Sequence, residues 1–359
     1  MLEPIIQDSK VVEFNGLYKI QLEIPPSSTL TNYETQRILE IASWKDGEVS
    51  DKVDGYEGGR SVLIEREVPD YRDNIVFEGL QISGVGYRQL KNSGTFGVLE
   101  GTEISFQPPS TSNFFEKMSN VGRTANIVDG KWISEQEQYA PVGTYSENLL
   151  RRKVGNTLIL SKLRSKRFLA PTVEAYGRYV DLIDVDGKPC GFLVTPIPDV
   201  NLPRYGDWLL TESQENLRLL YHSGKILIKL AKALRELHDL GFVHRQPHLG
   251  NFYDLEDTIY LVDWATMLPL RQDLRAVDIG IVHASINSIV DYAMKNHGQE
   301  GEMFSQDFGI VSLELLLRSY LGLKKIKIRE FHSKLSRQLG RNAGYNETVI
   351  HFLRKHFQD

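Results

Sequence analysis

The hydrophobic pattern changes once along this chain, and the change limits the fold more than any other feature. From residue 76 to residue 200, short apolar alternations dominate, and two of them enclose Asp-Gly pairs that favour tight turns between strands. Beyond residue 201, apolar residues recur at the spacing of one helix face, and Gly241 follows where a helix would end. The apolar residues are Leu220, Leu227, Leu230, Ala231, Leu234 and Leu237. Strands followed by helices predict an α+β protein with a strand-rich lobe and a helical lobe.

The same patterns divide the chain into three predicted segments. Residues 1–75 form an N-terminal extension to which the sequence assigns no role. Residues 76–200 form the strand-rich lobe with one helix, which begins at a Ser146-Glu147 pair typical of a helix N-terminus and runs to about residue 165. Residues 201–359 form the helical lobe.

Composition narrows the classes of function. A formal net charge of -5 gives no overall attraction to nucleic acid or to anionic membranes. Cys190 is the only cysteine, so the chain can form no internal disulfide and no cysteine-based metal site, which fits a reducing compartment. With no signal peptide and no stretch near the ~20 apolar residues that span a bilayer, we expect a cytoplasmic protein.

One stretch carries the chemistry, VHRQPHLGNFYDLEDTIYLVDWAT at residues 243–266. It resembles the catalytic segment of the protein-kinase-like superfamily, including the aminoglycoside-phosphotransferase-like branch, where H-x-D-x-x-x-x-N precedes two short strands and an aspartate. His244 and Asn251 keep that spacing, residues 252–262 predict the two strands and their turn, and Asp263 stands at the position of the metal-binding aspartate.

The resemblance implies a bilobal protein-kinase-like fold that binds ATP and Mg²⁺. Mg²⁺ takes hard oxygen ligands from one or two carboxylates or amides and keeps several waters, and Asn251 and Asp263 can supply such a pair across one hairpin. By the same resemblance, His244 braces the loop against the Asp263 segment, and Asp278 bonds the backbone of the loop from the following helix.

The catalytic position departs from the family pattern. Gln246 stands where the family has its catalytic aspartate, and His248 stands where protein kinases have a lysine. An amide cannot accept a proton as a base, and general-base assistance typically contributes about 10²- to 10⁴-fold. Two substitutes stay open: Gln246 orients a nucleophile by hydrogen bonding, or neutral His248 takes the proton.

The signals for the nucleotide lobe are weaker. Residues 92–99, NSGTFGVL, resemble the phosphate-covering loop of the same superfamily. Gly94, Phe96 and Gly97 match its pattern, and Asn92 stands in place of the first glycine. Glycines let backbone N–H groups approach a phosphate closely, but short glycine pairs also make ordinary turns.

Lys131 is the candidate for the nucleotide-binding lysine, and Glu147 is the candidate for its acidic partner. The alternatives are a solvated turn lysine and a first-turn glutamate favoured by the helix dipole. Residues 151–167 carry seven lysines and arginines and no acid, which suits an acidic protein partner or substrate, nucleotide phosphates, or a solvated helix face. No aromatic residues interleave with these charges, so RNA is disfavoured.

Three functions remain open from the sequence. The first is a kinase-fold protein that binds Mg-nucleotide as a pseudokinase or an atypical kinase, favoured by the retained Asn251 and Asp263. The second is an active phospho- or nucleotidyl-transferase that acts on a protein or a small molecule. The third is an interaction module that binds no nucleotide, favoured by the missing first glycine of the phosphate loop.

Overall fold

A computed structural model gives the fold of the chain. It describes residues 5–45, 52–53, 61–72, 75–90, 104–107, 123–128, 131–136, 143–163, 165–184, 186–212, 216–294 and 298–322. The chain forms two compact units: unit 1 comprises Met1–Arg123, Gln136–Lys162 and Pro171–Leu202, and unit 2 comprises Thr124–Glu135, Leu163–Ala170 and Pro203–Asp359. Unit 1 is rich in strands and unit 2 is rich in helices, which confirms the α+β fold class.

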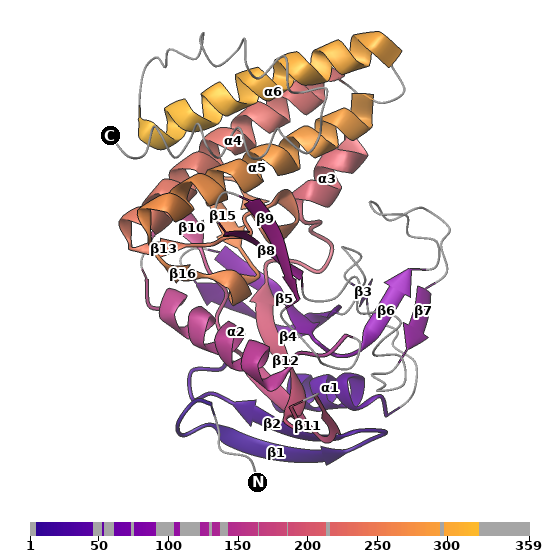
Figure 1. Cartoon of the computed structure of the whole chain (residues 1–359). Coiled ribbons are helices and arrows are strands. Elements are labelled where there is room, and N and C mark those ends of the chain that lie inside the picture. The colour runs from indigo at the N-terminus through magenta and orange to yellow at the C-terminus, as the bar shows by residue number, and fades with distance from the viewer. Residues whose placement is uncertain are drawn as a thin grey trace. The chain divides into compact units, whose positions relative to one another are not determined.

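Unit 1 is built around a seven-stranded antiparallel sheet in the order β1-β2-β11-β12-β5-β4-β3 (Figure 1). Its strands are β1 (Lys10–Asn15), β2 (Lys19–Ile24), β3 (Lys52–Val53), β4 (Ser61–Arg72), β5 (Ile75–Ser83), β11 (Ala175–Ile183) and β12 (Pro189–Ile197). The sheet crosses the boundary that the sequence placed at residue 75, because β2 pairs with β11 and β4 pairs with β5.

Both hairpins predicted from Asp-Gly pairs are present. β11 pairs with β12, and Gly187 in their turn adopts a φ of 72°, which an L side chain rarely takes. β8 (Arg123–Val128) pairs with β9 (Lys131–Gln136), and a further two-stranded sheet joins β6 (Tyr87–Leu90) to β7 (Ile104–Gln107).

The described residues of unit 1 contain two helices, each capped at its start by a side chain, and the sequence predicted the start of the second. Helix α1 (Asn32–Ser43) begins with a capping box between Thr31 and Glu34, and it buries Ile38, Leu39 and Ala42 in the same hydrophobic cluster as Ile20 and Leu22 of β2. Helix α2 (Glu147–Leu160) is capped by the Ser146 hydroxyl, which accepts from the Leu149 amide. It ends at Leu160, five residues before the predicted end. There the Ser161 hydroxyl donates a hydrogen bond to the Leu158 carbonyl.

A buried arginine ties the sheet of unit 1 to the start of α2. Arg178 on β11 is fully buried, and its guanidinium donates to Glu147 through Nε and Nη2 at 3.1 and 3.2 Å. Its Nη1 donates to Glu23 on β2, which also accepts from the Tyr176 hydroxyl. One guanidinium therefore neutralises two carboxylates that would otherwise be buried without a counter-charge.

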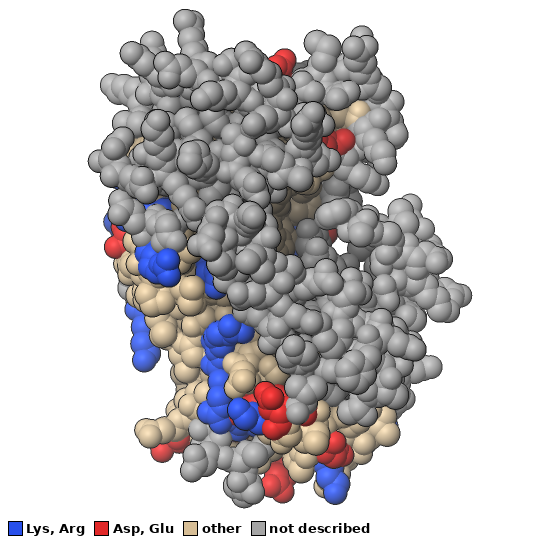
Figure 2. Space-filling view, viewed as in Figure 1, with Lys and Arg blue, Asp and Glu red and all other residues tan. Residues whose placement is uncertain are grey.

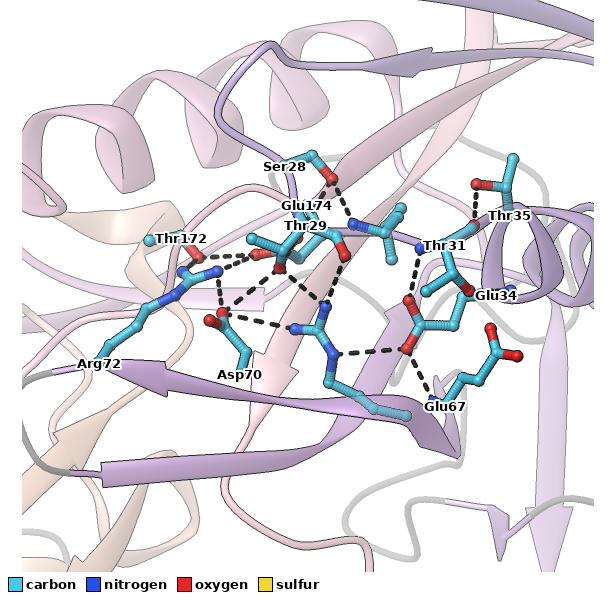
Figure 3. Close-up of polar contacts among 12 residues, drawn as sticks. Ser28, Thr29, Thr31, Glu34, Thr35, Glu67, Asp70, Arg72, Thr172 and Glu174 are labelled. Carbon is cyan, nitrogen blue, oxygen red and sulfur yellow. Dashed lines mark hydrogen bonds and ion pairs between the residues drawn. The ribbon is translucent and has the colours of Figure 1, made fainter.

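A second polar network fastens the loop before α1 to β4 (Figure 3). Glu174 is fully buried and accepts from the Thr29 amide at 3.0 Å and from Arg72 at 2.6 Å, and Arg72 with the Thr29 amide holds the pKa of this carboxyl below its ordinary value against the effect of burial. Arg66 donates through Nη2 to the Thr29 hydroxyl at 2.8 Å and lies 3.5 Å from Glu34. Because each buried charge meets an opposite one, the network can hold this loop in one conformation.

Unit 2 consists of long helices around short strands. The helices are α3 (Tyr205–Glu212), α4 (Asn216–Asp239), α5 (Gln272–Met294) and α6 (Gly298–Leu321). The strands are β10 (Phe168–Leu169), β13 (Phe242–Val243), β14 (Phe252–Leu255), β15 (Thr258–Leu261) and β16 (Leu268–Pro269), together with most of β8 and β9. Short 3-10 turns span Leu249–Asn251 and Trp264–Thr266. Helices α4, α5 and α6 pack on one another (Figure 1).

The predicted leucine period forms the core face of α4. Leu227, Leu230, Leu234 and Leu237 have no exposed surface, and Gly241 follows the helix with a φ of 90° and donates its amide to the His238 carbonyl. Among the described residues, no helix combines the length and apolar character needed to span a bilayer.

Replacing Arg178 with methionine tests the buried ion pairs. We expect Arg178→Met to lower the free energy of unfolding by roughly 3–5 kcal/mol, because Glu23 and Glu147 would lose their shared counter-charge inside the protein. The control is Arg151→Met, which removes a half-exposed partner of Glu147 and should cost less than about 1 kcal/mol. Urea unfolding of both variants measures the difference, and equal losses would contradict this account.

Candidate functional site

The loop after α4 is held by one buried carboxylate. Asp278 on α5 has no exposed surface, and it accepts from the His244 amide at 2.8 Å and from the Arg245 amide at 2.6 Å. His238, near the end of α4, lies 3.0 Å from the same carboxylate. Both amides reach the carboxylate because Arg245 adopts a left-handed backbone conformation with a φ of 70°. This conformation costs a non-glycine residue about 1–3 kcal/mol. The carboxylate therefore stabilises a strained turn.

His244 connects this loop to the segment that precedes Asp263. Its Nδ1 accepts from the Gln246 amide at 3.3 Å, and its Nε2 donates to the Val262 carbonyl at 3.0 Å. Burial lowers the pKa of His244, so the ring is neutral and carries its proton on Nε2. Its ring centroid lies 4.4 Å from that of Trp264, which fixes the ring from a third side.

Asn251 and Asp263 flank the two ends of the β14–β15 hairpin. The Val262 amide donates to the Asn251 carbonyl at 2.9 Å, so Asp263 follows a residue that is bonded directly to Asn251. The Asn251 side chain donates from Nδ2 to the Gln246 carbonyl at 2.9 Å, and its Oδ1 accepts no hydrogen bond from the described residues. Asp263 is half-buried, and its backbone adopts the left-handed conformation with a φ of 59°.

Asn251 and Asp263 carry oxygen types that Mg²⁺ binds. The Nδ2 contact fixes the orientation of the Asn251 carboxamide, and Asp263 directly follows Val262, whose amide is bonded to the Asn251 carbonyl. Mg²⁺ needs only one or two protein oxygens because substrate phosphates and waters complete its octahedron. No cluster of three or more His, Cys, Asp or Glu side chains able to hold a metal occurs in the described part of the chain.

Both backbone polar groups of Gln246 form hydrogen bonds within the loop. Its amide donates to His244 Nδ1, and its carbonyl accepts from Asn251 Nδ2. The side chain is half-buried, and its carboxamide makes no hydrogen bond to the described residues. It is a neutral group that can both donate and accept.

His248 is a poor candidate for the base. Its Nδ1 accepts from the Gly250 amide at 3.2 Å, so the ring proton is on Nε2 and that atom can only donate. Burial lowers the pKa of His248 to about 4, and the positive charge of Arg204 adds to this effect, while the negative charge of Asp263 opposes it. A neutral imidazole with a low pKa and its lone pair already bonded accepts a proton weakly.

Sequence reasoning missed two residues before α3 and at its start that support the loop. Arg204 donates from Nη1 to the Gly250 carbonyl at 2.8 Å, and its guanidinium lies 5.7 Å from the centroid of the Tyr253 ring. A Cβ at Gly206 would lie 3.2 Å from the Leu249 carbonyl carbon, so this close approach favours glycine. The sequence signal was an Arg-Tyr-Gly run after Pro203, with no spacing that would mark it.

The predicted roles of the nucleotide-lobe residues stay predictions. Gly94, Phe96 and Gly97 lie outside the residues that the structure describes, as does the side chain of Lys131 at the start of β9. Among the described residues, Glu147 pairs with Arg178 and with Arg151. The buried Arg178 guanidinium and the dipole at the start of α2 both stabilise the negative charge of Glu147.

The basic segment at residues 151–167 is also partly engaged. Arg151 donates to Glu147 at 2.6 Å, and Lys153 is buried with its ammonium 4.7 Å from the centroid of the Tyr145 ring. Lysine and arginine atoms nevertheless gather on the visible surface over α2 (Figure 2). The acid-free segment in the sequence therefore has acidic and aromatic partners from outside it.

The chain is similar at low identity to several solved structures. WaaP in complex with acyl carrier protein matches at a TM-score of 0.35 and 13% identity, over 68% of this chain and 92% of that chain. A rhoptry antigen kinase domain of Toxoplasma gondii matches at a TM-score of 0.34 and 13% identity, over 87% of this chain and 94% of that chain. No protein-family model and no curated protein matches the chain.

A third structure is described as a divergent kinase that lacks the glycine-rich loop and regulates membrane ultrastructure of the Toxoplasma parasitophorous vacuole. It matches at a TM-score of 0.27 and 18% identity, over 55% of this chain and 69% of that chain. No TM-score among the three exceeds 0.35.

Replacing Asp278 with asparagine tests the carboxylate that holds the loop. The substituted carboxamide has only one oxygen and would turn its own N–H donors toward a backbone N–H, so we expect Asp278→Asn to lower the free energy of unfolding by about 2–4 kcal/mol. Hydrogen exchange at the His244 and Arg245 amides should become faster. The control is Asp257→Asn, which changes an exposed residue in the turn of the β14–β15 hairpin. If the His244 and Arg245 amides exchange as slowly in Asp278→Asn as in the wild type, Asp278 does not hold the loop.

The protonation of His248 can be measured by nitrogen NMR. The ring should be neutral at pH 7 with its proton on Nε2, and it should titrate near pH 4. Since the unfolded chain takes up this proton near pH 6.5 and the folded chain only near 4, the contribution to stability is present above 6.5 and falls as the pH is lowered between these values. A ring that titrates near 6.5 in the folded protein would show that His248 is not buried as described.

Proposed function

We propose that this protein binds Mg-nucleotide through Asn251 and Asp263 and transfers phosphate to hydroxyl groups poorly or not at all. The observation that carries the proposal is the backbone bond between Asn251 and Val262, which joins the two ends of one hairpin and so links Asn251 to the residue before Asp263. The neighbouring loop has Gln246 in place of a base. Magnesium would bridge nucleotide phosphates to these two side chains and offset the charge of the phosphates.

The loop geometry supports binding even without catalysis. Asp278 fixes the backbone at residues 244 and 245, His244 joins this backbone to Val262, and Asn251 is bonded to Gln246. These contacts lie within unit 2 and position both proposed ligands before any nucleotide arrives. A preorganised pair of ligands loses less conformational entropy on binding.

The loss of the base weakens only one part of the chemistry. General-base assistance contributes about 10²- to 10⁴-fold, whereas phosphoryl transfer depends mainly on positioning and charge stabilisation. A kinase-fold protein with this site can therefore act as a nucleotide-dependent switch, in the manner of a pseudokinase, because a bound ligand stabilises whichever conformation binds it better.

An active phospho- or nucleotidyl-transferase is the second candidate. It is favoured by the half-buried Gln246 carboxamide, which makes no hydrogen bond to the described residues and can orient a reacting group. An interaction module without nucleotide is the third candidate. The basic segment at residues 151–167 would serve an acidic partner under any of the three.

Thermal unfolding with nucleotide tests the proposal. Millimolar ATP with Mg²⁺ should raise the unfolding temperature, because ligand that binds only the folded state stabilises it by mass action. Asp263→Ala should abolish this rise, since it removes the carboxylate ligand. The matched control is Asp257→Ala, which removes an exposed carboxylate from the turn of the same hairpin and should keep the full rise.

The outcome that contradicts the proposal is specific. Wild-type protein that gains no stability from ATP with Mg²⁺, or an Asp263→Ala protein that gains as much as Asp257→Ala, would remove Asp263 from the nucleotide site. Mass spectrometry on the same samples separates the second candidate, because a covalent phosphate or AMP adduct that is lost in Asp263→Ala identifies a transferase.

A further inference from the structure

The carboxylate that holds the loop has a third partner, the ring of His238. His238 Nε2 lies 3.0 Å from Asp278 Oδ2, the same oxygen that accepts from the His244 amide. Because a carboxylate can only accept, Nε2 carries a proton and donates it. The Arg245 amide donates to the other oxygen, Oδ1. His238 therefore limits the rotation of the carboxylate to which both loop amides are bonded.

The second nitrogen of His238 contacts helix α6. Its Nδ1 lies 2.6 Å from the Tyr320 hydroxyl, and the two rings meet edge to face with their centroids 5.5 Å apart. Burial raises the pKa of Tyr320 above its ordinary value, so the hydroxyl keeps its proton at neutral pH and can donate it to Nδ1. Arg235 on α4 donates from Nη1 to the Tyr320 carbonyl at 3.1 Å, which ties the last turn of α6 to α4.

The three side chains in this series of bonds are enclosed by protein. Tyr320 is 4% exposed, His238 is 1% exposed, and Asp278 has no exposed surface. A buried polar atom that loses its partner cannot bond to bulk water instead, and it then costs the free energy of its desolvation. A change at the Tyr320 hydroxyl should therefore affect His238, and through His238 it should affect Asp278.

We propose that Tyr320 is a positioning residue for the candidate site, and that the last turn of α6 controls the geometry of the loop through His238 and Asp278. The hydroxyl orients the His238 ring, the ring orients the carboxylate, and the carboxylate holds Arg245 in its left-handed conformation. A displacement of this turn of α6 loosens the loop that precedes the β14–β15 hairpin. The effect on the loop stands alone, and the effect on nucleotide binding rests on the proposed function.

A matched control for Tyr320 lies on α3. Tyr205 is also 4% exposed, and its hydroxyl also bonds to α4, where it donates to the His222 carbonyl at 3.0 Å. This bond does not involve His238 or Asp278. Tyr320→Phe and Tyr205→Phe therefore each remove one buried hydroxyl that is bonded to α4, but only Tyr320→Phe breaks the series of bonds to the loop.

The test is hydrogen exchange at the His244 and Arg245 amides in the full chain, with the Leu230 amide in the core of α4 as the internal reference. We expect Tyr320→Phe to speed the exchange of the loop amides relative to this reference by about three- to tenfold, because the net contribution of one buried hydrogen bond corresponds to about that factor. Tyr205→Phe should change the same ratio by less than about twofold. The ratio removes any loss of global stability that the two variants share.

Two further readouts separate a positioning role from a loss of packing. Nitrogen NMR of the His238 ring should show the Nδ1 resonance shifted in Tyr320→Phe and unchanged in Tyr205→Phe, because only the first change removes the partner of Nδ1. In the Asp278→Asn background, Tyr320→Phe should add less than about twofold to the exchange ratio, because the carboxylate through which it acts is gone. If Asp278→Asn does not fold, the ratio and the NMR shift decide alone.

Two results would overturn the inference: an exchange ratio in Tyr320→Phe equal to that of the wild type, or the same rise in Tyr205→Phe. Under the proposed function, Tyr320→Phe should also weaken Mg-ATP binding at least about twofold, since a looser loop positions its metal ligand less well. Equal affinities in the wild type and Tyr320→Phe would overturn the link to the nucleotide. Failure of the proposed function looks different, because a wild type that binds no Mg-ATP leaves the exchange ratio and the His238 shift to decide the role of Tyr320.

Discussion

The buried carboxylate of Asp278 is the constraint on which the candidate site depends. It accepts from two successive amides and so holds Arg245 in a left-handed conformation that the residue would otherwise avoid. His244 then reaches the Val262 carbonyl and leaves its other nitrogen for the Gln246 amide. These bonds also position the two ends of the β14–β15 hairpin. Val262, just before Asp263, is bonded both to His244 and to Asn251.

The proposed function separates two tasks that a phosphotransferase performs together. Binding charged phosphates needs a metal, and under the proposal its ligands are Asn251 and Asp263. Moving a proton needs a base, and Gln246 and His248 suit this task poorly, since the first is an amide and the second has a pKa lowered to about 4 by burial and a lone pair already bonded to Gly250. Under the proposal, the protein keeps the part of the chemistry that contributes positioning and charge.

Much of this site could be predicted from the sequence because it is local. The spacing of His244, Asn251 and Asp263 reflects one helix end, one loop and one hairpin, and each has its own sequence signal. Arg204 could not be found this way, since its contact with Gly250 depends on how α3 packs against the loop. The partners of Glu147 were missed for the same reason: Arg178 lies on a strand 31 residues further along the chain.

Paramagnetic broadening by Mn²⁺ tests whether Asn251 coordinates the metal of a bound nucleotide, as proposed above. With asparagine side chains labelled with ¹⁵N, the protein is titrated with ATP and Mn²⁺ in place of Mg²⁺. The account predicts that the Asn251 side-chain resonance disappears at low Mn²⁺ and returns when EDTA is added. A sharp Asn251 resonance at saturating ATP and Mn²⁺ would contradict it.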